Sequence, residues 1–433
     1  MRFLHLSDLH INQHPLGSPH DLDADIRDVV DSDAAALAEQ LGGIDGILIT
    51  GDVAFSGHNT EYSKAAVWLE RLAGRIGCDA DRVWVIPGNH DVDWSVLAAE
   101  PELLEAHDEL RRCGVGDLTN LLSRRLLDKI KPPLLAPLGN YISFARNYGC
   151  QLTADQPFWV SELDAGDGHK IRVCGLSSPL LSDEHDDVDA HKLALGTFQC
   201  AIPWRPTDAV IVLCHHPPQW LRDGDEAEKY FDARAVLQLF GHKHLQHKGR
   251  WQNTVRLQSG ALHPERGPGW QPRYNVITVD WPVQGTVRIG VRPRVWWDDL
   301  TRFGPDRTLN GAAFESWDLP LARAAVAIGA DEGVGAEAPD HPISLAQDVV
   351  PDATASPERR LAYGLSRLPH LALVTLGVRL DLLKEEDDLR SPSLVDALIQ
   401  RGQDAGRLAE LWDSVGTQIV GDLFGLNPFR KEA

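Results

Sequence analysis

The chain has 433 residues, of which 42 are Lys or Arg and 63 are Asp or Glu, so its formal net charge is −21. Hydrophobic residues make up 43% and charged residues 24%, which excludes a collagen-like or wholly disordered chain, and the length predicts two to three domains. So acidic a surface argues against a broad nucleic-acid footprint, which needs clustered cations, but it leaves room for a local basic channel and suits a protein that collects divalent cations.

Short apolar runs alternate with amphipathic segments in the first part of the chain. Residues 2–6, 46–50 and 82–86 are predicted strands, and residues 23–41 and 61–76 are predicted helices between them. Such alternation is typical of βαβ units with parallel strands. The next segments continue less regularly: residues 103–130 are predicted to be helical, and residues 158–163, 170–175, 209–213 and 235–240 to be strands.

The hydrophobic pattern changes after residue 246. Residues 253–259, 274–280 and 286–292 alternate with a period of two and predict an antiparallel sheet. Residues 329–356 have little periodicity and predict a linker, and residues 357–427 are mostly helical in pattern. We therefore expect a first domain at 1–300, an extension and linker at 301–356, and a helical module at 357–433.

The cysteines and the apolar runs bear on where the protein works. None of the six cysteines forms a C-x-x-C pair, so the sequence predicts neither a zinc knuckle nor a redox motif, and the thiols are expected to be buried in a reducing compartment. The chain has no run of 18 apolar residues and no apolar stretch before Asp8, so neither a membrane span nor a signal peptide is expected. We expect a cytoplasmic protein.

Polar residues follow several of the predicted strands in five short motifs. They are Asp8-Leu9-His10, Gly51-Asp52, Gly88-Asn89-His90-Asp91, His215-His216-Pro217-Pro218 and Gly241-His242-Lys243-His244. In open α/β sheets, ligand sites gather outside the carboxyl ends of the strands. This mixture of oxygen and nitrogen donors suits manganese, iron, zinc or nickel better than calcium. The donors are too many for one tetrahedral site, so the sequence predicts two metals, with a carboxylate shared between them.

The ordered set D-x-H, G-D, G-N-H-D, H and G-H-x-H resembles the calcineurin-like metallophosphoesterase superfamily over about residues 1–300. The segment Gly51-Asp52-Val53-Ala54-Phe55-Ser56-Gly57, followed by Glu61 and Tyr62, is similar to the bacterial phosphodiesterase-like branch rather than to protein phosphatases. The resemblance implies a four-layer α/β sandwich with two central mixed sheets flanked by helices. It also implies metal-dependent hydrolysis of a phosphoester, with manganese as the first expectation for the two metals.

Carried over position by position, the resemblance implies a role for each motif residue. Asp8, His10 and His244 would bind the first metal. Asn89, His215 and His242 would bind the second, and Asp52 would bridge both. His90 would protonate the leaving oxygen or stabilise the phosphoryl charge, and Asp91 would orient His90 through a hydrogen bond. His216 is interpreted as a pocket or packing residue that could contact substrate.

Two further features leave alternatives open. Trp94, Trp220 and Trp270 lie near motif loops, where each could stack a nucleobase or simply pack. Residues 357–427 resemble the small helical effector-associated, death-like domains of bacterial conflict systems, which bind a partner with a similar domain. The alternative interpretation of that segment is a helical cap that completes the fold.

The sequence thus predicts a two-metal phosphoester hydrolase, most simply a phosphodiesterase that acts on nucleotides or single-stranded nucleic acid. The resemblance of residues 357–427 implies a role as an effector in a bacterial defence or signalling system. Two alternatives remain at this point. One is a phosphomonoesterase acting on a small metabolite or a phosphoprotein. The other is a signalling adaptor with a sensor-like enzyme domain, against which the complete set of metal ligands argues.

Overall fold

In the computed structural model the chain packs into two compact units, Met1–Ala327 and Ile328–Ala433. The structure describes residues 1–14, 16, 18, 21, 23–183, 186, 193–202, 205, 208–244, 246–262, 271–297, 301–307, 312–321, 357, 361, 365, 376–377, 379–380, 382–383, 394–416 and 428–430. The predicted linker at 329–356 lies outside these residues.

The first unit contains two mixed sheets. One has the strand order β12-β11-β10-β1-β2-β3, with β13 paired to β11. Its parallel part, β1 to β3, is built from apolar runs, and β10 pairs antiparallel with β1, with Arg2 opposite Thr278. The strand bounds are β1 (Arg2–Leu6), β2 (Gly46–Ile49), β3 (Val83–Val85), β10 (Arg273–Val283), β11 (Thr286–Trp297), β12 (Arg302–Pro305) and β13 (Glu315–Pro320).

The other sheet has the order β4-β5-β6-β7-β9-β8. Strands β5, β6, β7 and β9 are parallel, and β4 and β8 close the two edges as antiparallel partners. All six residues of β6 and all four of β7 are buried, as expected of parallel strands covered on both faces. The strand bounds are β4 (Phe158–Gly166), β5 (His169–Leu176), β6 (Asp208–Leu213), β7 (Leu237–Phe240), β8 (His247–Trp251) and β9 (Thr254–Gln258).

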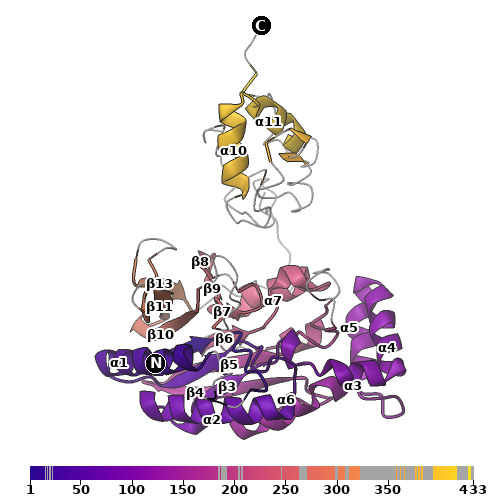
Figure 1. Ribbon diagram of the computed structural model, residues 1–433, viewed down its shortest axis with the longest axis vertical. Helices are drawn as coiled ribbons and strands as arrows, with labels where there is room; N and C mark the ends of the chain where they lie inside the picture. The colour runs from indigo at the N-terminus through magenta and orange to yellow at the C-terminus, as the bar shows by residue number, and fades with distance from the viewer. Residues whose placement is uncertain are drawn as a thin grey trace, which may run out of the picture. The chain divides into compact units, whose positions relative to one another are not determined.

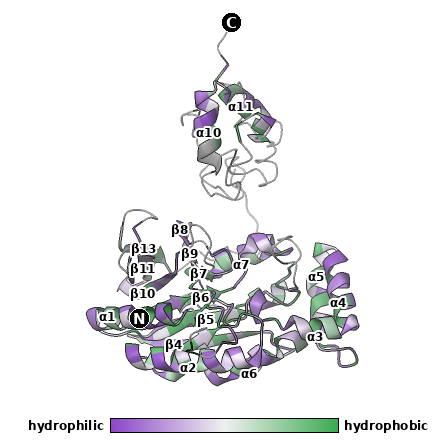
Figure 2. Ribbon diagram, viewed as in Figure 1, coloured by the Kyte–Doolittle hydropathy of each residue, from purple (hydrophilic) through white to green (hydrophobic). Residues whose placement is uncertain are grey.

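Helices cover the sheets. Figure 1 shows α2 and α6 on one side of the strands and α7 on the other, and Figure 2 shows hydrophobic strands inside helices that carry hydrophilic residues. The four-layer architecture expected from the sequence is confirmed. The α-helices that the structure describes in this unit are α1 (Ala24–Leu41), α2 (Asn59–Ile76), α3 (Trp94–Ala99), α4 (Pro101–Arg112), α5 (Val115–Leu126), α6 (Gly139–Ala145) and α7 (Gly224–Arg234).

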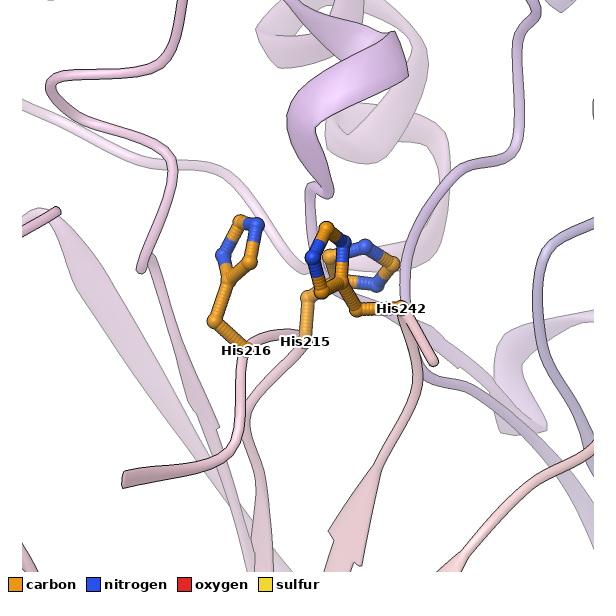
Figure 3. A group of neighbouring side chains, drawn as sticks. All are labelled: His215, His216 and His242. Atoms are coloured by element: carbon orange, nitrogen blue, oxygen red, sulfur yellow. The ribbon is translucent and has the colours of Figure 1, made fainter. Parts of the chain in front are cut away.

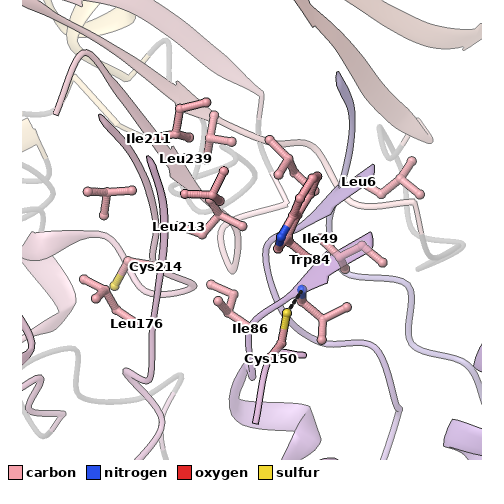
Figure 4. Packing of buried hydrophobic residues seen from close by; sticks show 14 of the residues in the cluster. Leu6, Ile49, Trp84, Ile86, Cys150, Leu176, Ile211, Leu213, Cys214 and Leu239 are labelled. Carbon is pink, nitrogen blue, oxygen red and sulfur yellow. Dashed lines mark hydrogen bonds between the residues drawn. The ribbon is translucent and has the colours of Figure 1, made fainter. Parts of the chain in front are cut away.

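The two sheets share one core. In Figure 4, Leu6 and Ile49 of the first sheet face a space that Ile211, Leu213 and Leu239 of the second sheet fill from the other side. These side chains are fully buried, and each buried Leu or Ile contributes about 1.5–3 kcal/mol through burial. Packing of this strength holds the carboxyl ends of strands from both sheets at a fixed separation.

Three predicted elements differ in the structure. The predicted helix at 103–130 is two helices, because Cys113 adopts an extended conformation (φ −64°, ψ 159°) and ends α4. The three alternating segments do not form one antiparallel sheet: β9 joins the second sheet beside β7, whereas β10 and β11 belong to the first. The first sheet also extends beyond residue 300 through β12 and β13.

The second unit has a hydrophobic core of its own. Helices α10 (Leu394–Asp404) and α11 (Leu408–Gly416) are its longest described elements. Its buried side chains include Leu398, Leu411 and Trp412, and they form a cluster separate from the core of the first unit.

The cysteines and the helices of the described residues bear on the cellular compartment that the sequence predicts. All six cysteines are free thiols, and five of them are buried, with only Cys113 half-buried. Among the helices that the structure describes, none combines the length and the apolar character that a bilayer crossing requires.

Candidate metal centre

Five loops that follow strands of both sheets converge on one place. The loops after β1, β2 and β3 carry Asp8, Asp52 and Asn89, and the loops after β6 and β7 carry His215 and His242. Backbone hydrogen bonds connect neighbouring loops: the N–H of His10 donates to the carbonyl of Asp52 at 2.9 Å, and the N–H of Gly241 donates to the carbonyl of His215 at 3.0 Å. The parallel strands therefore bring residues distant in sequence to one edge.

The first expected ligand group is compact. Asp8, His10 and His244 each place a donor atom within 4.8 Å of the others. Nε2 of His244 lies 3.3 Å from Oδ1 of Asp8, and Nε2 of His10 lies 4.0 Å from the same oxygen. The backbone N–H of His242 also donates to Oδ1 of Asp8 at 3.2 Å. One carboxylate oxygen thus faces two imidazoles from different loops.

The second expected group is equally close. Oδ1 of Asn89 lies 3.1 Å from Nε2 of His215 and 3.1 Å from Nδ1 of His242. Nδ1 of His215 lies 2.7 Å from the carbonyl of Thr50, and because a carbonyl only accepts, that nitrogen carries the proton. In the neutral, metal-binding form of His215 the lone pair is therefore on Nε2, which faces the site, an orientation typical of metal-binding histidines.

Asp52 lies between the two groups. Its Oδ2 is 3.3 Å from Nε2 of His10 and 3.2 Å from Nε2 of His215. Its Oδ1 accepts a hydrogen bond from the backbone N–H of His90 at 2.9 Å, which fixes the carboxylate plane. One side chain is thus within reach of both groups, as a bridging ligand must be.

Burial and neighbouring charges set the protonation states. Burial lowers the pKa of His242 to about 3, with a further contribution from His215, and burial also lowers the pKa of His10. Both rings are therefore neutral near pH 7, the form that binds metals. Burial also disfavours a charged His215, but the Asp52 carboxylate beside it outweighs this and raises its pKa to about 9. For Asp52, burial opposes ionisation, yet His215 and His90 hold its pKa well below the usual range.

Two observations indicate that this donor set fits a cation. Oδ2 of Asp8 is fully buried without a hydrogen-bond partner among the described residues, an arrangement that is costly for a carboxylate unless a cation neutralises it. Backbone strain is also concentrated here. Among the described non-glycine residues, eight have positive φ, and five of these belong to the motifs: Asp8, His10, Asp52, His242 and His244. Strain of this kind persists where function requires it.

A close approach of the backbone to Asp52 requires the glycine at position 88. Its φ of −112° is accessible to any residue, but an added Cβ would overlap Oδ1 of Asp52. Gly88→Ala should displace this carboxylate and weaken metal affinity by about 10- to 100-fold, the usual cost of disturbing a supporting contact. A metal titration followed by calorimetry measures the change. Gly74→Ala in α2 is the matched control, because a Cβ there meets no atom within 4 Å; equal affinity of both variants would contradict the assignment.

The structure corrects one detail of the G-N-H-D motif. Asp91 was expected to orient His90, but its carboxylate accepts hydrogen bonds from the N–H groups of Val53, Ala54 and Gly88 and from the hydroxyl of Tyr62, at 2.9–3.2 Å. Nδ1 of His90 instead lies 2.9 Å from the carbonyl of Phe55, to which it donates. Asp91 therefore ties loops together, and Phe55 sets the orientation of the His90 ring.

The remaining histidines near the centre have distinct surroundings. The rings of His215, His216 and His242 are grouped in Figure 3, and His216 and His242 have ring centroids 4.5 Å apart. His216 is fully buried; its Nδ1 lies 2.8 Å from Ser178 Oγ, and its Nε2 has no hydrogen-bond partner among the described residues. His90 also places a nitrogen within 4.8 Å of donor atoms of His10 and Asp52. The motifs alone did not predict that His216 would lie beside His242, or that His90 would lie close to His10 and Asp52.

The three tryptophans of the sequence analysis separate in the structure. Trp220 packs edge-on against His242, with ring centroids 4.2 Å apart, which favours the packing interpretation. Trp94 is 40% exposed and lines a cavity that also contains His90. Trp270 lies outside the described residues.

Several solved structures are similar to this chain over about three quarters of its length. Among solved structures, a purple acid phosphatase from yellow lupin seeds has a TM-score of 0.39 at 12% identity, covering 74% of this chain and 53% of that one. A putative 5′-nucleotidase from Staphylococcus aureus has a TM-score of 0.34 at 15% identity, covering 76% and 56%. A predicted phosphoesterase from Streptococcus pneumoniae has a TM-score of 0.28 at 11% identity, covering 73% and 97%. Comparison with curated protein sequences gave no match.

The family assignment comes from the sequence model of the calcineurin-like phosphoesterases. This model matches residues 1–246, which is more than half of the chain and includes all five motifs. The protein therefore belongs to the calcineurin-like phosphoesterase family and is a metal-dependent phosphoester hydrolase with a centre for two divalent metal ions.

Proposed function

We propose that the protein is a phosphodiesterase that acts on nucleotides or nucleic acid at a centre formed by Asp8, His10, Asp52, Asn89, His215, His242 and His244. The observation that carries this proposal is the position of Asp52, whose Oδ2 lies 3.3 Å from a nitrogen of one ligand group and 3.2 Å from a nitrogen of the other. Divalent metals bound there, with manganese as our first expectation, supply an activated water and Lewis-acid stabilisation of phosphoryl charge.

His90 is the residue that we assign to the leaving group. Its Nδ1 proton is donated to the carbonyl of Phe55, so the proton that it can deliver is on Nε2. The ring lies tilted beside that of His10, with ring centroids 4.3 Å apart and an angle of 43° between the planes, and His90 also lines a cavity. In its imidazolium form the ring carries a second proton on Nε2, and it can give that proton to the oxygen that leaves phosphorus as the P–O bond breaks.

A basic cavity beside the centre favours a substrate with more than one phosphate. It has a volume of 460 Å³ and is lined by Pro217, Lys243, His247, Arg250 and Arg256, among others. Pro217 and Lys243 come from the same loops as His215 and His242, so the cavity adjoins the metal ligands. Arg256 is paired with Glu228 and Asp232. Local positive charge on a chain of net charge −21 suits a substrate with several phosphates better than a substrate with a single phosphate.

The proposal is tested by loading the protein with manganese and measuring hydrolysis of bis-p-nitrophenyl phosphate, p-nitrophenyl phosphate, cyclic nucleotides, and single- and double-stranded DNA and RNA. We expect diesters to have the higher kcat/KM. Preference for p-nitrophenyl phosphate would instead support the phosphomonoesterase alternative. Loss of all hydrolysis despite a metal content near two per chain would support a sensor-like role.

We further propose that the second unit is an adaptor that binds a separate helical domain, which would suit an effector in a bacterial defence or signalling system. This rests on its separate cluster of buried residues, which includes Leu398, Leu411 and Trp412. A unit with its own core is able to fold and to bind a partner as an independent module.

Truncation separates the adaptor from a structural cap. A chain that ends after residue 328 should keep its metals, its rate on a small chromogenic ester and its melting temperature, because all proposed ligands and all strands that the structure describes precede that point. If the unit is a cap, deletion should lower the melting temperature by several degrees, since about 1 kcal/mol corresponds to roughly 2–4 °C in a domain of this size. Melting curves and small-ester kinetics of the two chains decide the question.

A further inference from the structure

Two exposed aromatic side chains flank His90. Phe55 is 45% exposed and Trp94 is 40% exposed, whereas most other aromatic rings that the structure describes are buried or half-buried. The ring centroid of His90 lies 5.7 Å from that of Phe55 and 6.4 Å from that of Trp94. Among the other described aromatic residues, Tyr230 and Phe314 are comparably exposed, but neither lies near His90 in the cavity described next.

Phe55, His90 and Trp94 line one cavity of 340 Å³, together with Ser56, His58 and Asp93. This volume is within the range of small-molecule sites, which are mostly apolar with a few polar groups. The exposed aromatic surface is thus turned toward a space that is large enough for a planar ring. An exposed Phe or Trp has a free-energy cost in water that a stacked ligand removes.

The cavity wall is held in place by hydrogen bonds. The Asp91 carboxylate accepts from the N–H groups of Val53 and Ala54, just before Phe55, and from that of Gly88, just before the loop of His90. Asp93 accepts from the N–H of Ser95 at 3.0 Å and so caps the helix that begins with Trp94. The three rings are therefore positioned before a ligand arrives, which reduces the entropic cost of binding.

We propose that Phe55 and Trp94 form a stacking site for the nucleobase on the leaving side of the scissile phosphoester. This inference rests on the proposed function, and in particular on His90 as the group that serves the leaving oxygen. Because His90 lines the same cavity, a group attached to the oxygen that His90 serves lies beside Phe55 and Trp94. The carboxylate of Asp93 in the wall disfavours a second phosphate there and favours an uncharged, planar group.

The site makes a specific prediction about two ligands that share a phosphate and differ in the base. Adenosine 5′-monophosphate and ribose 5-phosphate are titrated by calorimetry into the metal-loaded full-length chain. We expect adenosine 5′-monophosphate to bind about 5- to 100-fold more tightly, the range for one base stacked on aromatic side chains. Phe55→Leu and Trp94→Leu should each reduce this ratio severalfold while leaving the affinity for ribose 5-phosphate unchanged. Trp94→Phe should preserve most of it.

Phe314→Leu is the matched control, because Phe314 is 41% exposed and packs under Arg292. It should keep the wild-type ratio. Equal affinity of the wild type for both ligands, or a wild-type ratio in the Phe55→Leu/Trp94→Leu double variant with an unchanged melting curve, overturns the stacking site. If the enzyme still hydrolyses diesters, such a result leaves the proposed phosphodiesterase function standing. If the enzyme prefers the ligand with the base but hydrolyses no diester, the phosphodiesterase function is contradicted and the stacking site is not.

Discussion

Asp52→Asn should deplete both metal positions at once and lower activity by more than about 100-fold. Loss of a contact that only supports a metal ligand costs about 10- to 100-fold, and Asp52 is proposed to be a direct ligand of both ions. The amide keeps the shape of the side chain but removes the negative charge within 3.3 Å of His10 and 3.2 Å of His215. Elemental analysis after manganese loading should fall well below the two ions per chain expected for the wild type.

Asp31→Asn is the control for this exchange. The Asp31 carboxylate is fully buried and pairs with Arg71 at 2.8 Å, but it lies on α1 and outside the motif loops. Its replacement should affect stability and leave metal content unchanged. Full metal occupancy and full activity in Asp52→Asn would remove Asp52 from the bridging position.

His90→Asn should leave metal content nearly intact while lowering turnover by about 10²- to 10⁴-fold, the usual contribution of a general acid or base. The loss should be smaller for substrates that release p-nitrophenol, because a good leaving group needs less protonation. Metal content is the decisive second measurement, since His90 places a nitrogen near donor atoms of His10 and Asp52. A loss of one ion per chain would make His90 a ligand.

His169→Asn serves as the comparison for His90, because His169 stacks on Trp281 at the start of β5, with ring centroids 4.7 Å apart. It should retain wild-type turnover on every substrate. Equal losses in His90→Asn for good and poor leaving groups would indicate electrostatic stabilisation of the phosphoryl group instead of proton transfer. Unchanged rates would exclude His90 from the reaction.

Most of the fold could be predicted because its central strands are short apolar runs separated by amphipathic helices. The partner of β9 could not, since alternation along Thr254–Gln258 shows that the segment is a strand but not which sheet receives it. The strands β12 and β13 escaped prediction because Arg302–Pro305 and Glu315–Pro320 are short and carry charged and proline residues. Only their pairing with β11, a long-range contact, makes them strands.

The motif residues could be predicted to meet because strand ends on one edge of a parallel sheet are neighbours, and the structure brings all seven proposed ligands together. The contacts of Asp91 could not be predicted, because adjacency in sequence to His90 says nothing about the direction of its carboxylate. Phe55 received no role from the sequence. Its carbonyl bond to His90 and its exposure depend on the path of the loop after β2, which the amino-acid types alone do not define.

The antiparallel pairing of Arg2 with Thr278 has a consequence for the newly made polypeptide. Synthesis proceeds from the N-terminus at about 5–20 residues per second, so β1 leaves the ribosome long before β10. In that interval one edge of β1 exposes unpaired backbone groups, which invite association with other chains. All seven proposed ligands are synthesised before β10, and the last of them is His244. We therefore expect catalytic competence to arise only after residues 273–283 emerge, and a nascent chain stalled before them to depend on chaperones.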